Sequence, residues 1–224
     1  MAKEDFYNWF ETVASRLQVR RDSFYKIFKY LDNLPDPIII VETGCLRIKN
    51  NFSDGQSTLL FDKYTQFRKN KAKVFTVDID PNATKICKEN VSGNVSIHTG
   101  DSVKYLNELV EEFIKNKSEV SMFYLDSFDC DWKSPEQSSQ HHLKELVSIK
   151  KILKKDTLVV VDDSPIIGYL QQSQVKKDSF DLIRPGLVPG PTISGKGSLV
   201  HEYAVHVGAK MLFSNYQTGW VGFN

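Results

Sequence analysis

Residues 38–47 read Ile-Ile-Ile-Val-Glu-Thr-Gly-Cys-Leu-Arg, and residues 54–58, after a polar insert, read Asp-Gly-Gln-Ser-Thr. Four consecutive β-branched apolar residues without alternation are typical of a strand buried on both faces of a parallel sheet. The run ends on Glu42, and Gly44 and Gly55 permit tight turns that bring backbone N–H groups close to a ligand. The layout is compatible with a cofactor site and with a merely tight turn.

Four further apolar runs resemble this one and alternate with segments of helical periodicity. The five predicted strands occupy residues 38–41, 74–77, 95–98, 122–125 and 157–161. Strands that alternate with helices predict right-handed crossovers and therefore an open, doubly wound α/β sheet with helices on both faces. Residues 210–213 and 219–223 flank a polar turn and predict a C-terminal hairpin.

Residues 1–37 precede the first strand and are predicted to form an N-terminal helical extension, whereas residues 38–224 form the α/β domain. Aromatic and aliphatic residues recur in the extension at spacings of three and four, which is helical periodicity. Pro35 and Pro37 end it, because a residue before proline avoids the helical region. The helices either cover an edge of the core or form a lid or a homo-oligomer surface.

The composition argues against several classes of protein. Lys+Arg 29 against Asp+Glu 28 gives a net charge of +1, so no positive field would gather nucleic acid or an anionic membrane. Cys45, Cys87 and Cys130 lack Cys-x-x-Cys spacing, which argues against a disulfide framework and a zinc site. Neither a signal peptide nor an apolar run of about 18 residues is present. We expect a cytoplasmic protein without nucleic-acid or membrane partners.

Acidic side chains follow four of the five predicted strands. They are Glu42, Asp78, Asp126 and the pair Asp162 and Asp163. Ligands of open parallel sheets bind outside the carboxyl ends of the strands. One such acid is most simply a helix cap or a turn former, but four on one rim indicate a binding site. Asp101 and Ser102, after Gly100, add polar groups beyond the third strand.

Asp78 and the turn that starts at Gly44 indicate the class of cofactor. Asp78 ends the second strand, where a carboxylate can accept hydrogen bonds from both hydroxyls of a ribose. A nicotinamide or flavin dinucleotide would require Gly-x-Gly-x-x-Gly against its diphosphate, and Gly44-Cys45-Leu46-Arg47 does not supply it. The pattern favours an adenosine-type cofactor without a diphosphate.

The chain from about Ile38 onward resembles class I S-adenosylmethionine-dependent methyltransferases. The resemblance rests on Glu42-Thr43-Gly44, Asp78 in Val-Asp-Ile-Asp-Pro, Gly100-Asp101-Ser102, Leu125-Asp126 and Val161-Asp162-Asp163. It implies a Rossmann-like, mostly parallel seven-stranded sheet whose C-terminal hairpin strand is antiparallel. Within the class, the chain looks most like metal-dependent O-methyltransferases of the catechol and macrolide-sugar types.

The resemblance also implies ligands and roles. S-adenosyl-L-methionine would be held by Glu42, Gly44, Ser57, Asp78, Asp101 and Ser102, and Mg²⁺ by Asp126, Asp162 and Asp163. The acceptor would be a hydroxyl of a small molecule, such as a sugar or glycoside. Mg²⁺ would neutralise the three carboxylates and lower the pKa of the acceptor hydroxyl, and Asp126 would be the catalytic residue that accepts its proton.

The insert after the first strand and the segment before the C-terminal hairpin each allow more than one interpretation. The insert of residues 47–54 replaces the tight glycine motif typical of the class, which leaves the roles of Arg47 and Gln56 undecided. Lys196 is either a substrate contact or a solvent-exposed loop lysine. Residues 166–175 are predicted as a helix and residues 180–197 as a long loop of the kind that often forms a lid.

Two other functions compete with methyl transfer. A non-catalytic module would bind S-adenosylmethionine without methylating an acceptor. Asp78-Ile79-Asp80 and Asp162-Asp163 also resemble metal-dependent phosphohydrolases of the haloacid dehalogenase type. In those enzymes the Asp-x-Asp motif follows the first strand of the sheet, whereas a strand precedes it here.

Overall fold

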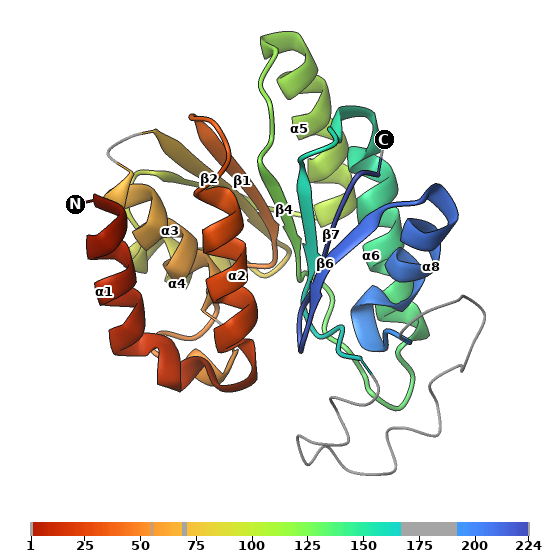
Figure 1. The fold of residues 1–224 in the computed structure, drawn as a ribbon, viewed down its shortest axis with the longest axis horizontal. Coiled ribbons are helices and arrows are strands. Elements are labelled where there is room, and N and C mark those ends of the chain that lie inside the picture. The colour runs from red at the N-terminus through yellow and green to blue at the C-terminus, as the bar shows by residue number, and fades with distance from the viewer. Residues whose placement is uncertain (1, 55, 69–70, 167–191, 224) are drawn as a thin grey trace.

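The computed structural model describes residues 2–54, 56–68, 71–166 and 192–223. A seven-stranded sheet has the order β3-β2-β1-β4-β5-β7-β6. The pairs among β1 to β5 are parallel, and β7 is antiparallel to both β5 and β6. Helices cover both faces, with α1 to α4 on one side and α5, α6 and α8 on the other (Figure 1). The predicted Rossmann-like sheet with an antiparallel C-terminal hairpin is confirmed.

The elements have the following bounds. The strands are β1 (Ile38–Thr43), β2 (Ala72–Asp78), β3 (Val95–Thr99), β4 (Met122–Leu125), β5 (Leu158–Val161), β6 (Lys210–Ser214) and β7 (Thr218–Val221). The α-helices are α1 (Ala2–Ala14), α2 (Arg21–Leu31), α3 (Ser57–Phe67), α4 (Pro81–Asn90), α5 (Ser102–Asn116), α6 (Glu136–Ile149) and α8 (Ser198–Val207). Short 3₁₀ turns are η1 (Ser15–Arg20), η2 (Phe52–Asp54), η3 (Lys150–Ile152) and η5 (Gly195–Gly197). Residues 167–175 of the predicted helix and 180–191 of the predicted loop lie outside the described residues.

The central strands bury both faces, which explains their unbroken apolar runs. Successive side chains of a strand point to opposite faces. Ile40 and Tyr124 belong to a core beneath α1, α2 and α3, whereas Val41 and Phe123 belong to a second core beneath α5, α6 and α8. All four side chains are at most 1% exposed.

The N-terminal helices share the first of these cores. Phe6, Phe10 and Phe28 of α1 and α2 are at most 1% exposed. The ring of Phe24 stacks on Tyr124 of β4 at a centroid distance of 5.9 Å. The two helices therefore cover a face of the sheet rather than an edge, and these buried aromatic side chains are not available to a second copy of the chain.

The N-terminal helices also contact the C-terminal hairpin. The Ser23 hydroxyl of α2 donates to the Gln217 side chain, and both residues are fully buried. The Lys26 ammonium donates to Asn215 Oδ1 at 3.1 Å. Residues near the two ends of the described chain are thus packed together.

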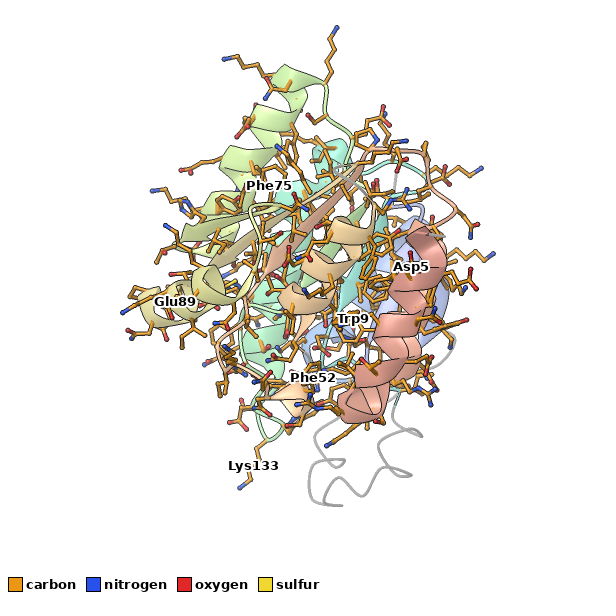
Figure 2. The ribbon with its side chains drawn as sticks, turned by 90° about the vertical axis from the view of Figure 1, so that its left-hand side faces the viewer. Asp5, Trp9, Phe52, Phe75, Glu89 and Lys133 are labelled. Atoms are coloured by element: carbon orange, nitrogen blue, oxygen red, sulfur yellow. The ribbon has the colours of Figure 1, made fainter. Side chains whose placement is uncertain are left out.

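Loops that follow the parallel strands gather at one end of the molecule. Phe52 follows β1 and Lys133 follows β4, and both lie at the lower end of Figure 2. This is the rim where the sequence places a binding site. None of the described helices is long and apolar enough to cross a membrane.

Candidate functional site

An open cleft lies at the carboxyl ends of the strands. The empty space within it is about 530 Å³, a figure that includes its solvent-filled mouth. Five residues predicted from the sequence to bind a cofactor or a metal line it, namely Gly44, Ser57, Asp78, Asp126 and Asp163. The fold therefore brings together Asp78, the last residue of β2, and residues that follow β1, β4 and β5.

Gly44 allows the loop after β1 to lie against the loop after β4. Its φ is +80°, and a Cβ added there would lie 2.6 Å from the carbonyl oxygen of Asp126. Its N–H donates to the carbonyl of Val77 at 2.8 Å. A side chain at this position would both strain the backbone and separate the two loops, so the cleft depends on glycine here.

Asp78 is held at the wall of the cleft by backbone donors. Its Oδ2 accepts a hydrogen bond from the N–H of Cys45 at 3.1 Å, and its Oδ1 accepts one from the N–H of Asp80 at 2.9 Å. A carboxylate oxygen has two acceptor lone pairs, so each oxygen retains one for a ligand. This geometry suits a pair of ribose hydroxyls.

Three other predicted cofactor residues do not line the cleft. Glu42 still belongs to β1, so it faces the same side as Ile40, and its Oε2 accepts from the Thr58 hydroxyl at 2.7 Å. Complete burial raises the pKa of Glu42 to about 7. Asp101 is exposed and caps α5, and Ser102 Oγ lies 2.9 Å from His141 Nε2. Their cofactor roles stay predictions.

The insert of residues 47–54 forms another wall of the cleft. The Arg47 guanidinium pairs with Asp54 at 2.9 Å and with Asp129 of the loop after β4 at 2.8 Å. The Gln56 amide donates to the carbonyl of Ile48 at 2.7 Å and holds the end of the insert. Arg47 and Gln56 both line the cleft, so the insert replaces the expected glycine motif with side-chain contacts.

Two buried cations neutralise the carboxylates after β4 and β5. Arg20 Nε lies 3.1 and 2.9 Å from the two carboxylate oxygens of Asp162, and its Nη2 lies 2.9 Å from Asp163 Oδ1. Lys196 Nζ donates to Asp126 and lies 3.1 Å from Asp163 Oδ2. Burial opposes the ionisation of Asp163, but Lys196 and Arg20 outweigh it and lower the pKa of Asp163 to about 2.

Lys196 is 1% exposed, so its interpretation as a solvent-exposed loop lysine is wrong. Burial alone would lower its pKa, but the carboxylates of Asp126 and Asp163 hold the pKa above the usual value. The side chain reaches the cleft because the turn around it has no side chains. A Cβ on Gly195 would lie 2.1 Å from the carbonyl oxygen of Asp163, and one on Gly197 would lie 2.5 Å from Ser164 Cβ.

Arg20 was missed by the sequence analysis. It lies at the end of η1, and its Nη1 also donates to the carbonyl of Ser53 in the insert, at 3.0 Å. A signal was present, because Arg20 stands between Leu17 and Phe24 at the spacing of their buried apolar stripe. A cation on such a stripe requires a buried acid.

The described residues do not fit Mg²⁺ at this position. Mg²⁺ requires free oxygen ligands in near-octahedral geometry. Both oxygens of Asp162 accept from Arg20, and one of them also accepts from the Tyr124 hydroxyl at 2.9 Å. Asp163 is shared between Arg20 and Lys196, and Asp126 is bound by Lys196. Among the residues that the structure describes, no group of three His, Cys, Asp or Glu side chains is arranged to hold a metal ion.

Comparisons with known proteins concern the fold. No family model and no curated protein matches the sequence. Cofactor-bound Rv0187 from MTB has a TM-score of 0.53 at 10% identity, with 97% of this chain and 89% of that chain covered. A SAM-dependent methyltransferase from Anabaena variabilis has a TM-score of 0.49 at 12% identity, with 98% and 92% covered. A S-adenosylmethionine-dependent methyltransferase from Clostridium acetobutylicum has a TM-score of 0.45 at 12% identity, with 96% and 97% covered. The similarity to Rv0187 shows that the two chains share a fold over nearly the whole length of this chain, and at 10% identity it shows the fold alone.

Proposed function

We propose that this protein is an S-adenosylmethionine-dependent methyltransferase. The observation that carries the proposal is the arrangement of Gly44 and Asp78, which places a fixed carboxylate beside a turn that begins with glycine in the cleft. In this fold, nucleoside ligands bind at the carboxyl ends of the strands. The solved structures of similar fold include proteins described as methyltransferases that use this cofactor.

The ends of β2 and β4 supply further support. Ile79 is 73% exposed and Phe128 is 44% exposed, and they directly follow the cleft-lining residues Asp78 and Ser127. An apolar part of a ligand favours exposed apolar side chains such as these, which are next in the chain to residues that line the cleft. We assign the ribose to Asp78 and the adenine face to these two side chains.

The bound cofactor supplies an electrophilic methyl group on a sulfonium. The chain must then align the acceptor with that methyl group and exclude water. We propose a hydroxyl of a small molecule, such as a sugar or glycoside, as the acceptor, because charged and polar side chains line the cleft. With the cofactor bound, the acceptor oxygen would take the methyl group, the electron pair of the carbon–sulfur bond would go to sulfur, and Asp126 would accept the proton of the acceptor.

A phosphohydrolase and a non-catalytic binding module would use these residues differently. A phosphohydrolase would need both acids of Asp78-Ile79-Asp80, but the Asp80 side chain caps α4 by accepting from the N–H of Asn82 at 2.8 Å. The motif also follows β2 rather than the first strand of the chain. A non-catalytic binding module would bind the cofactor equally well, and it differs only in failing to transfer the methyl group.

Calorimetry with S-adenosylmethionine and S-adenosylhomocysteine tests the proposal. We expect both to bind the wild type, and Asp78→Asn to weaken binding at least about tenfold, because hydrogen bonds to a charged acceptor contribute about 1.5–3 kcal/mol. Asp80→Asn is the matched control, since asparagine also caps helices and this residue does not line the cleft. If neither compound binds the folded wild type, the proposal is wrong.

A further inference from the structure

The position predicted for a divalent cation contains a charged group of the chain itself. Asp126 and Asp163 approach each other at the ends of β4 and β5, and the Lys196 ammonium bridges them, donating to Asp126 and lying 3.1 Å from Asp163 Oδ2. Lys196 and Asp163 each have less than a fifth of their side chain exposed. An ammonium between two carboxylates provides the neutralisation for which a metal would otherwise be required.

The surrounding backbone is shaped to deliver this lysine. Lysine is one of the residue types least often fully buried, because removing its charge from water is costly. The backbone N–H of Lys196 donates to the carbonyl of Asp163 at 3.1 Å. Gly195 and Gly197 lie so close to Asp163 and Ser164 that neither can carry a Cβ without displacement. The turn therefore fixes the ammonium opposite the acids.

The hydrogen-bond capacity of the cluster is divided between the two cations. Arg20 takes both oxygens of Asp162 and one oxygen of Asp163. Lys196 donates to one oxygen of Asp126 and forms an ion pair with the other oxygen of Asp163 at 3.1 Å. An ammonium has three N–H donors, so a third N–H remains for an oxygen ligand. Both Lys196 and Asp126 line the cleft, and the Asp126 side chain is 24% exposed.

We propose that Lys196 is the internal cation of this site, which occupies the position between Asp126 and Asp163 and makes the site independent of a divalent metal. The occupied position itself does not depend on the proposed function. The role of Lys196 in catalysis does rest on the proposed function. In that role, the third N–H of Lys196 binds the acceptor oxygen, which is the task of the metal in metal-dependent enzymes.

Manganese binding followed by electron paramagnetic resonance tests the inference without an activity assay. Mn²⁺ prefers the same carboxylate and water ligands as Mg²⁺. We expect the wild-type chain to bind no stoichiometric Mn²⁺ at the rim. Lys196→Met keeps an unbranched apolar stem but frees two carboxylates, so we expect it to gain a Mn²⁺ site, which the further change Asp126→Asn removes. Lys210→Met, at an exposed position of β6 outside the cleft, is the control and should gain none.

Two results of the Mn²⁺ experiment would overturn the inference. One is stoichiometric Mn²⁺ binding by the wild type that Asp126→Asn abolishes, since the metal would then use the position assigned to the lysine. The other is a folded Lys196→Met variant, verified by a cooperative thermal transition, that gains no Mn²⁺ site. S-adenosylhomocysteine titrated into the wild type with and without chelator separates the two proposals. Equal affinity supports the internal cation, loss of affinity with chelator contradicts it, and absence of binding in both contradicts the proposed function alone.

Discussion

Arg20 and Asp162 stand 142 positions apart in the chain, yet Arg20 Nε lies 3.1 and 2.9 Å from the two oxygens of the Asp162 carboxylate. The side chains are 10% and 1% exposed, so the pair is shielded from solvent. Removing one partner of a buried ion pair leaves an uncompensated charge, which typically costs about 3–5 kcal/mol. We therefore expect Arg20→Ala to lower the free energy of unfolding in urea by about that amount.

The next residue in the chain is the control for this prediction. Arg21 pairs with Glu11 at 3.3 Å, but both side chains are more than half exposed. An exposed pair contributes at most about 1 kcal/mol. Arg21→Ala should therefore change stability little, and equal losses in the two variants would show that the burial of Arg20 has no energetic consequence.

Gly44→Ala should disturb both stability and ligand binding. The added Cβ would meet the carbonyl oxygen of Asp126 at 2.6 Å, and the φ of +80° is unfavourable for alanine. Strain of this kind costs on the order of 1–3 kcal/mol. Gly93→Ala provides the comparison, because its Cβ would meet nothing within 4 Å. Gly44→Ala should lower both the free energy of unfolding in urea and the affinity for S-adenosylhomocysteine measured by calorimetry, whereas Gly93→Ala should lower neither. Equal values for the two variants would contradict the close approach of the two loops.

Glu42 should make the protein less stable as the pH rises. Its pKa is raised from 4.5 to about 7 by burial, so the folded state binds the proton more tightly than the unfolded state. Its contribution is therefore fully present below about pH 4.5 and is lost as the pH rises through 7. At about 1.4 kcal/mol per pKa unit, the loss amounts to about 3 kcal/mol.

Glu42→Gln removes this titration and leaves the others in place. We expect the difference in unfolding free energy between wild type and Glu42→Gln to change in favour of the variant between pH 5 and 8. Urea unfolding at several pH values measures that difference. A constant difference across this range would mean that Glu42 titrates near its ordinary value.

Gly195→Ala and Gly208→Ala separate the effect of φ from the effect of contact. The two glycines have φ values of +63° and +75°, but only Gly195 would place a Cβ against other atoms, 2.1 Å from the carbonyl oxygen of Asp163. Gly208→Ala should cost about 1–2 kcal/mol from the left-handed conformation alone. Gly195→Ala should cost more, and it should also displace the Lys196 ammonium. Thermal unfolding checks the order, and a larger loss for Gly208→Ala would contradict it.

The strands could be predicted because their apolar runs have few alternatives. Residues 122–125 form β4 as expected, since a four-residue run buried on both faces is too short for a helix. The position of Gly44 and Asp78 in the cleft could be predicted for a related reason, because the ends of parallel strands lie on one rim. These features depend on local sequence and on the general rules of the fold.

The rest of the site could not be predicted, because it depends on the exact residue at which a strand ends and on contacts between residues far apart in the sequence. Glu42 was expected at the rim, but β1 continues through Thr43, so alternation turns the Glu42 side chain toward Thr58 of α3. Arg20 and Lys196 reach the rim from segments far from its acids in the sequence. The sequence showed three carboxylates in need of positive charge, and it did not show that the chain supplies that charge itself.

The contact between α2 and the hairpin of β6 and β7 has a consequence for synthesis on the ribosome. The apolar faces of α1 and α2 share one core with Phe213 of β6, and Ser23 is bonded to Gln217. These helices emerge early, whereas the hairpin emerges after almost all other described residues. Contacts between such distant segments form slowly and leave apolar surface exposed in the meantime. We therefore expect the nascent chain to need protection from aggregation until the hairpin has left the exit tunnel.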